Sequence, residues 1–131
     1  VKERCVYYVS VGSKVFILYF VRDVVGLSNP GDQAQVLAHA AVGTTVFASA
    51  GAGLASSLFS RALARPQTVA WAGSLVMAIG TGFWICPYFS DVETRKFILV
   101  FCTCVYGLGQ GAYLSADLAL TISTLPDPDE A

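Results

Sequence analysis

Four long apolar runs constrain the fold of this chain more than any other feature of its sequence. They lie at residues 5–25, 35–59, 68–89 and 97–125. Each has about the 20 residues that an α-helix needs to cross about 30 Å of hydrocarbon. A soluble helical bundle would need charged outer faces, whereas these runs are apolar or small almost all round. The pattern predicts an all-α membrane protein with four transmembrane helices, and a lipid bilayer as its first partner.

Composition and charge exclude several other classes. Charged residues make up 13% of the 131 residues, against about 25% in ordinary soluble domains. The formal net charge of −1 offers no basic surface for nucleic acid. The sequence has no Ser/His/Asp or Cys/His set and no metal-ligand spacing, so we expect neither an enzyme nor a cofactor or metal site. Cys102 and Cys104 would lie about 200° apart on a helix, as small buried residues on opposite sides.

The distribution of Lys and Arg predicts the orientation of the helices. Lys2 and Arg4 precede the first run, and Arg61 and Arg65 lie in the link 60–66, which has no acidic residue. The N-terminus and this link are therefore expected in the cytoplasm, together with the tail 127–130. The identity of the membrane does not follow from the sequence.

Small residues recur at helical spacing in two of the runs. In the second run, Ala48, Ala52, Ser56 and Ser60 are four positions apart. In the fourth, Gly107, Gly111 and Ser115 have the same spacing. Such patterns let helix backbones approach closely in lipid. The segment GLGQG lacks the spacing of a phosphate-binding loop and follows no strand, so we interpret its glycines as packing residues.

The fourth run also carries a narrow polar stripe. With Tyr106 at 0° and about 100° per residue, Gln110, Tyr113 and Asp117 fall between about −20° and 40°. Thr103 and Thr121 lie near 60°, whereas Ala112, Leu114 and Leu118 lie off the stripe. A polar stripe cannot face lipid and must face protein or a water-filled cavity. The sequence therefore favours a piece of a membrane transporter.

Two opposite charges are predicted at similar depth within the membrane. Lys14 lies roughly 14 Å and Asp117 about 13 Å from the cytoplasmic side, at 1.5 Å per residue. One hypothesis is that both face a shared cavity, where they pair or handle a charged substrate or a proton. The alternative is that Lys14 reaches the headgroups and Asp117 bonds a neighbouring helix. The lone His39 is interpreted as a packing residue, and Arg22 and Asp23 as interfacial anchors or a gate contact.

Two segments resemble the major facilitator superfamily. VFILYFVRDVVGL is similar to the seventh helix of its twelve-helix fold, and YGLGQGAYLSADLALTISTLPDPDEA to the tenth. The chain then resembles helices 7–10 of the C-terminal half. The family's loop signature would fall at residues 53–66, where only Arg61 and Arg65 remain of its charged residues. The resemblance implies that the seventh and tenth helices line a central cavity and that transport proceeds by alternating access.

These observations lead to one expected function and one alternative. The expected function is that of a secondary carrier for a small solute, coupled to protons or to another ion. Lys14, Tyr106, Gln110, Tyr113 and Asp117 would line the pathway. Because the chain begins with Val1 and has four predicted helices, we expect a fragment that works with the remaining helices of a longer transporter. The alternative is a four-helix membrane scaffold or assembly protein without transport activity.

Overall fold

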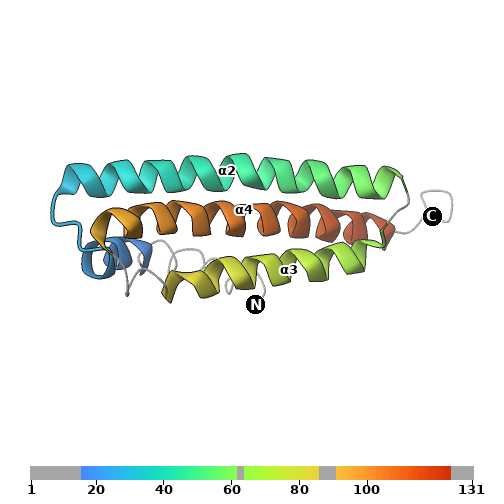
Figure 1. The fold of residues 1–131 in the computed structure, drawn as a ribbon. Helices are drawn as coiled ribbons and strands as arrows, with labels where there is room; N and C mark the ends of the chain where they lie inside the picture. The colour runs from blue at the N-terminus through green and yellow to red at the C-terminus, as the bar shows by residue number, and fades with distance from the viewer. Residues whose placement is uncertain (1–15, 62–63, 86–90, 125–131) are drawn as a thin grey trace.

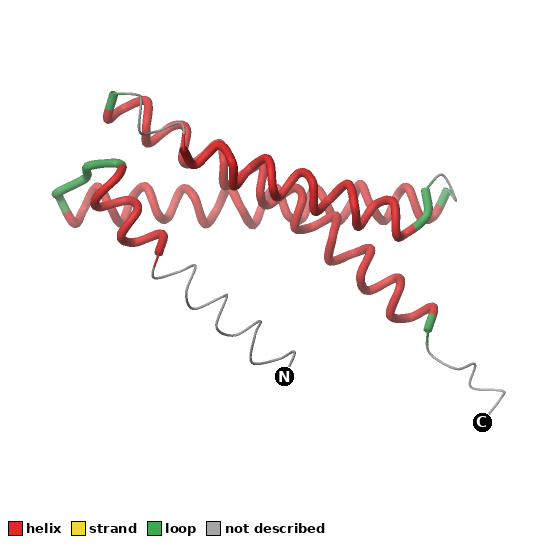
Figure 2. Tube along the Cα trace, turned by 90° about the horizontal axis from the view of Figure 1, so that it is seen from below, coloured by secondary structure: helices red, strands yellow, loops and turns green. Residues whose placement is uncertain are grey.

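The computed structural model describes residues 16–61, 64–85 and 91–124, which form helices joined by short loops (Figures 1 and 2). The elements in chain order are η1 (Phe20–Val24), α2 (Pro30–Ser60), α3 (Pro66–Gly82) and α4 (Val92–Ser123). No strand occurs in these three ranges. The all-α class predicted from the apolar runs is confirmed for this part of the chain.

The helix α4 lies between α2 and α3 and packs along both (Figure 1). The helices α2 and α4 begin at the same end of the molecule, and α3 begins at the other. The last turns of α4 lead away from the other two helices (Figure 2). One helix therefore forms the centre of a flat layer, and both of its packed sides need small residues.

Three of the described helices are long and apolar enough to cross a membrane. They are α2, α4 and the segment Pro66–Ile85, which contains α3. This indicates a multi-pass membrane protein. The first predicted run lies mostly outside the described residues. Its described part is helical, with α-helical geometry at residues 16–19 and a π-helical turn in η1.

The helices begin earlier than the sequence predicts. The helix α2 starts at Pro30 rather than at residue 35, and Asn29 caps it by accepting a hydrogen bond from the Gly31 N–H at 3.1 Å. Proline at the first helical position loses no hydrogen bond, so Pro30 can open this helix. The same holds for Pro66, which opens α3. The helix α4 begins at Val92, five residues before the predicted start, through a charged turn held by a Lys96–Glu93 ion pair at 2.8 Å.

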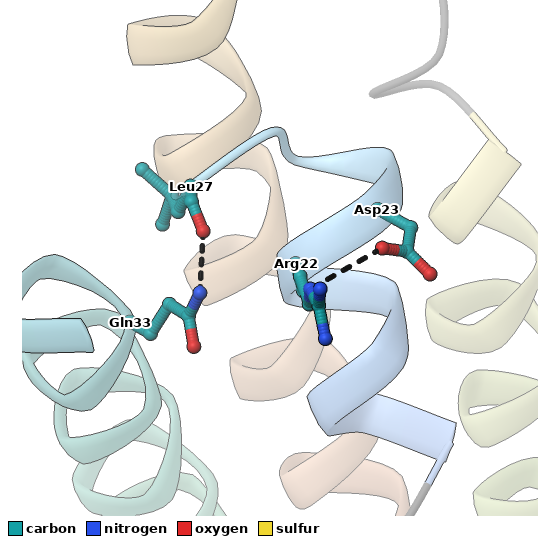
Figure 3. Close-up of polar contacts among 4 residues, drawn as sticks. All are labelled: Arg22, Asp23, Leu27 and Gln33. Carbon is teal, nitrogen blue, oxygen red and sulfur yellow. Dashed lines mark hydrogen bonds and ion pairs between the residues drawn. The ribbon is translucent and has the colours of Figure 1, made fainter. Parts of the chain in front are cut away.

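The turn between η1 and α2 closes one end of the layer. Gly26 has φ +77°, a left-handed conformation that glycine adopts without strain. The side-chain amide of Gln33 donates to the Leu27 carbonyl (Figure 3), and the Arg95 guanidinium donates to the Val24 carbonyl at 2.9 Å. Beneath the turn lies an apolar cluster that consists of Phe20, Val21, Val25, Leu27, Val36 and Leu99. Arg22 and Asp23 lie 3.9 Å apart and are exposed (Figure 3).

Glycines allow α2 and α4 to touch through their backbones. A Cβ atom added at Gly107 or Gly111 would run into the Thr44 or the Ala48 carbonyl of α2, and one at Gly51 into the Leu108 carbonyl of α4. A side-chain rotation cannot relieve such an overlap, because the added Cβ atom is fixed to one backbone and meets the carbonyl of another. The predicted packing role of Gly107 and Gly111 is confirmed.

Gly109, the middle glycine of GLGQG, lies on the other side of α4, where it contacts α3. A Cβ atom on Gly109 would lie 2.6 Å from the Gly73 carbonyl oxygen of α3, and one on Gly80 would lie 2.9 Å from the Tyr106 nitrogen. Gly109 points about 200° away from Gly107. Alternate glycines therefore let α4 contact a neighbouring backbone on each side.

The predicted register of α2 is wrong in part. Of the four-residue repeat, Ala48 does meet α4, but Ser56 and Ser60 are exposed. The buried positions of α2 are Val36, Ala40, Gly51 and Ala55. Small residues occur on several sides of this helix, and the contact with α4 determines which of these sides is buried.

Candidate functional site

The polar stripe of α4 lies on a side that α2 and α3 leave partly open. Tyr106 and Tyr113 are 37% and 36% exposed, and Asp117 is also exposed. Gln110 is half-buried. Thr103 differs, because it is 5% exposed and donates to the Val100 carbonyl. The four predicted site residues of α4 therefore share one accessible side of the helix.

A groove with both polar and apolar walls, which we call the polar groove, runs beside this stripe between α2 and α4, with a volume of about 480 Å³. Gln110 and Ser115 line it from α4, and Thr44, Thr45 and Ser49 line it from α2. The hydroxyls of these three α2 residues donate to carbonyls one turn earlier in the same helix. Each of these oxygens can still accept a hydrogen bond. The groove therefore offers hydrogen-bond acceptors along most of its α2 wall.

A second hollow, the aromatic groove, continues the same side toward the η1 end and measures about 410 Å³. Its lining residues are Phe16, Ile17, Thr44, Thr81, Trp84, Thr103 and Tyr106. Thr44 lines both grooves, so they adjoin. Phe16 stacks on Trp84 with ring centroids 6.5 Å apart, and the indole Nε1 is buried with no hydrogen-bond partner in the described part of the chain.

The opposite side of the layer is different in character. An apolar groove of about 330 Å³ lies there between α2 and α3. Apart from Thr68, its lining residues are apolar or glycine: Gly51, Leu54, Ala55, Leu58, Ala64, Val69, Ala72, Gly73, Val76, Leu108, Gly109 and Ala112. On α4, Ala112 and Gln110 lie two residues and about 200° apart. The layer therefore has one side on which polar and apolar residues mix, which we call the polar side, and one side whose groove is almost entirely apolar, which we call the apolar side.

A charged groove of about 500 Å³ lies at the end of the layer where α2 and α4 begin. Asp32 and His39 line it from α2, and Glu93 and Lys96 line it from α4. His39 is exposed, so it is not packed among the described helices, and its interpretation as a packing residue stays a prediction. Within the described ranges, no group of three or more His, Cys, Asp and Glu residues could hold a metal ion.

The remaining predicted residues are not part of this site. Lys14 lies outside the described residues, so its pairing with Asp117 stays a prediction. Arg61 and Arg65 follow the end of α2 and precede the start of α3, at the opposite end from the charged groove. Cys102 is buried, and the Cys104 sulfur lies beside Gly43 of α2. The Cys102 carbonyl oxygen faces Gly80 of α3.

Comparisons with models of protein families, with curated proteins and with solved structures found no match to this chain. Any function must therefore be argued from its own residues.

Sequence reasoning missed the α2 wall of the polar groove. Thr44, Thr45 and Ser49 are hydroxyl residues in an apolar run, and a helical projection groups them within about 140°. That signal was present, but it was hidden by the small-residue repeat of the same helix. On a helical projection, Leu114 and Leu118 lie outside the polar stripe. In the structure both line the polar groove together with Gln110.

Proposed function

We propose that these helices belong to an integral membrane carrier for a small solute, of the major facilitator type, that works by alternating access. The polar side of the layer would face the transport pathway, and the apolar side would face lipid. Tyr106, Gln110, Tyr113 and Asp117 would line the pathway from α4. The first predicted run of this chain, which contains Lys14, would close the pathway together with the remaining helices of the carrier.

The observation that supports this proposal is the contrast between the two sides of the layer. Hydroxyl, amide and carboxylate groups of α2 and α4 gather on one side, and the groove on the other has almost only apolar walls. A charged residue that faces lipid is costly, by about 2.5–3.5 kcal/mol on insertion scales when it lies at the helix centre. Asp117 lies six residues before the end of α4. Asp117 is exposed, and this cost is avoided if water or further protein covers the polar side.

A membrane scaffold without transport is the second candidate. Small-residue contacts of the kind seen between α2 and α4 also serve helix assembly. A scaffold would cover the polar side permanently with a partner helix. A carrier would open it to water in at least one conformation. The two functions therefore differ in whether the polar stripe of α4 becomes exposed to water.

Cysteine accessibility along α4 tests this difference. Single cysteines are placed at Gln110 and Asp117 on the polar side, and at Leu108 and Ala112 in the apolar groove, in a variant that lacks the four native cysteines. A membrane-impermeant thiol reagent reacts with the thiolate, which does not form in lipid. We expect the first pair to be labelled at least about tenfold faster than the second, as measured by mass shift in intact membranes.

Labelling of Leu108→Cys and Ala112→Cys with protection of Gln110→Cys and Asp117→Cys would contradict the proposal. Protection of all four positions under every condition would favour the scaffold. A solute that slows labelling only on the polar side would identify a candidate substrate.

A further inference from the structure

We propose that the apolar groove and the two arginines at its end form a binding site for one anionic phospholipid. An acyl chain would lie in the groove between α2 and α3, and the phosphate would lie between Arg61 and Arg65. This inference requires that the helices span a bilayer, but it does not depend on transport.

The groove begins at the arginine-bearing end of the layer. Leu58 lines it three residues before Arg61, and Ala64 lines it directly before Arg65. Along α3 it extends from Thr68 to Val76, which corresponds to about 12 Å at 1.5 Å per residue. One leaflet of the hydrocarbon is about 15 Å thick, half of the full core. The groove therefore has the depth of a single leaflet.

The lining of the groove fits an acyl chain rather than a polar ligand. Gly51, Gly73 and Gly109 form its floor where the helices meet, and Leu54, Leu58 and Val76 form its walls. Leu54 is 60% exposed. In water this surface would be unfavourable, and in a bilayer it is a channel for hydrocarbon.

The charge at the mouth of the groove fits a phosphate. Arg61 and Arg65 are both exposed, and neither guanidinium forms an ion pair within the described residues. The link 60–66 contains no acidic residue. Arg65 is also the N-cap of α3 and provides no side-chain cap. Pro66 has no N–H, so the Gln67 and Thr68 N–H groups are the ones left for an anion at the start of α3.

Neutral and anionic lipids should therefore differ at this site. Juxtamembrane arginines attract anionic lipids at the cytoplasmic leaflet, which is the side predicted for the link 60–66. Arginine also holds a phosphate with two parallel hydrogen bonds. The acyl chain alone would give no preference between headgroups.

The test is a titration of the purified protein in detergent with phosphatidylglycerol or phosphatidylcholine, followed by native mass spectrometry. We expect phosphatidylglycerol to bind more tightly. The Arg61→Gln, Arg65→Gln double variant should lose about fivefold in affinity for each arginine removed. The double lysine variant should keep most of the affinity. Arg22→Gln, at the opposite end, is the matched control and should bind as the unchanged protein does.

A second variant separates the groove from the charges. Ala72→Phe fills the groove on α3 and should remove most of the phosphatidylglycerol adduct, whereas Ala78→Phe, at an exposed position outside the groove, should not. Equal binding of both lipids, or unchanged binding by the double glutamine variant, would overturn the site. Unchanged binding by Ala72→Phe would overturn the placement of the acyl chain.

Discussion

The Gly107→Ala, Gly111→Ala double variant is expected to separate α2 from α4 and to lower the free energy of unfolding by about 3 kcal/mol or more. A single overpacked position usually costs about 1–3 kcal/mol. Here the added Cβ atoms would run into the Thr44 and Ala48 carbonyls. Because backbone cannot rotate out of the way, the whole helix must move. Thermal unfolding of the purified protein in detergent measures the effect.

Gly53→Ala is the matched control for this prediction. Gly53 lies in the interior of α2, and nothing stands within 4 Å of a Cβ atom added there. Since alanine is a better helix former than glycine by about 1 kcal/mol, this variant should be as stable as the original protein or slightly more stable. Equal unfolding midpoints for Gly111→Ala and Gly53→Ala would contradict the close contact between α2 and α4.

If these helices belong to the proposed carrier, Asp117→Asn is expected to lower its solute transport by about tenfold or more, which corresponds to about 1.4 kcal/mol, while leaving the amount of folded protein in the membrane unchanged. The carboxylate is exposed on the polar side of α4, so its removal breaks no packing. Asparagine keeps the shape and loses the charge. A growth or uptake screen of cells that express the full-length gene would first identify a transported solute, and the same assay would then measure the variant.

Asp91→Asn is the control for the loss of a carboxylate. Asp91 is exposed and is the N-cap of α4, but its side chain makes no capping hydrogen bond. The variant should transport as the original protein does. Full transport by Asp117→Asn would remove Asp117 from the pathway, and failure of both variants would point to a general effect of charge on insertion.

Parts of the fold could be predicted from single-helix periodicity. The length and apolarity of the runs were enough to indicate three helices able to cross a membrane, which are α2, α4 and the segment Pro66–Ile85, because a bilayer imposes a minimum helix length. The 100° rotation per residue placed Tyr106, Gln110, Tyr113 and Asp117 on one side of α4. The starts of α2 and α3 were predicted too late, because Pro30 and Pro66 each open a helix. Proline can stand at the start of a helix or just after its end, so the residue type alone does not locate the boundary.

What depends on neighbouring helices could not be read from the sequence. Gly107 and Gly109 were recognisable as packing residues, but only the tertiary structure decided that the first contacts α2 and the second contacts α3. The crossing of α2 and α4 determines which residues of α2 are buried. It also determines the position of the polar wall of Thr44, Thr45 and Ser49 and of the apolar groove on the opposite side. The periodicity of one helix determines which residues share a side. The close approach of a second backbone determines what that side touches.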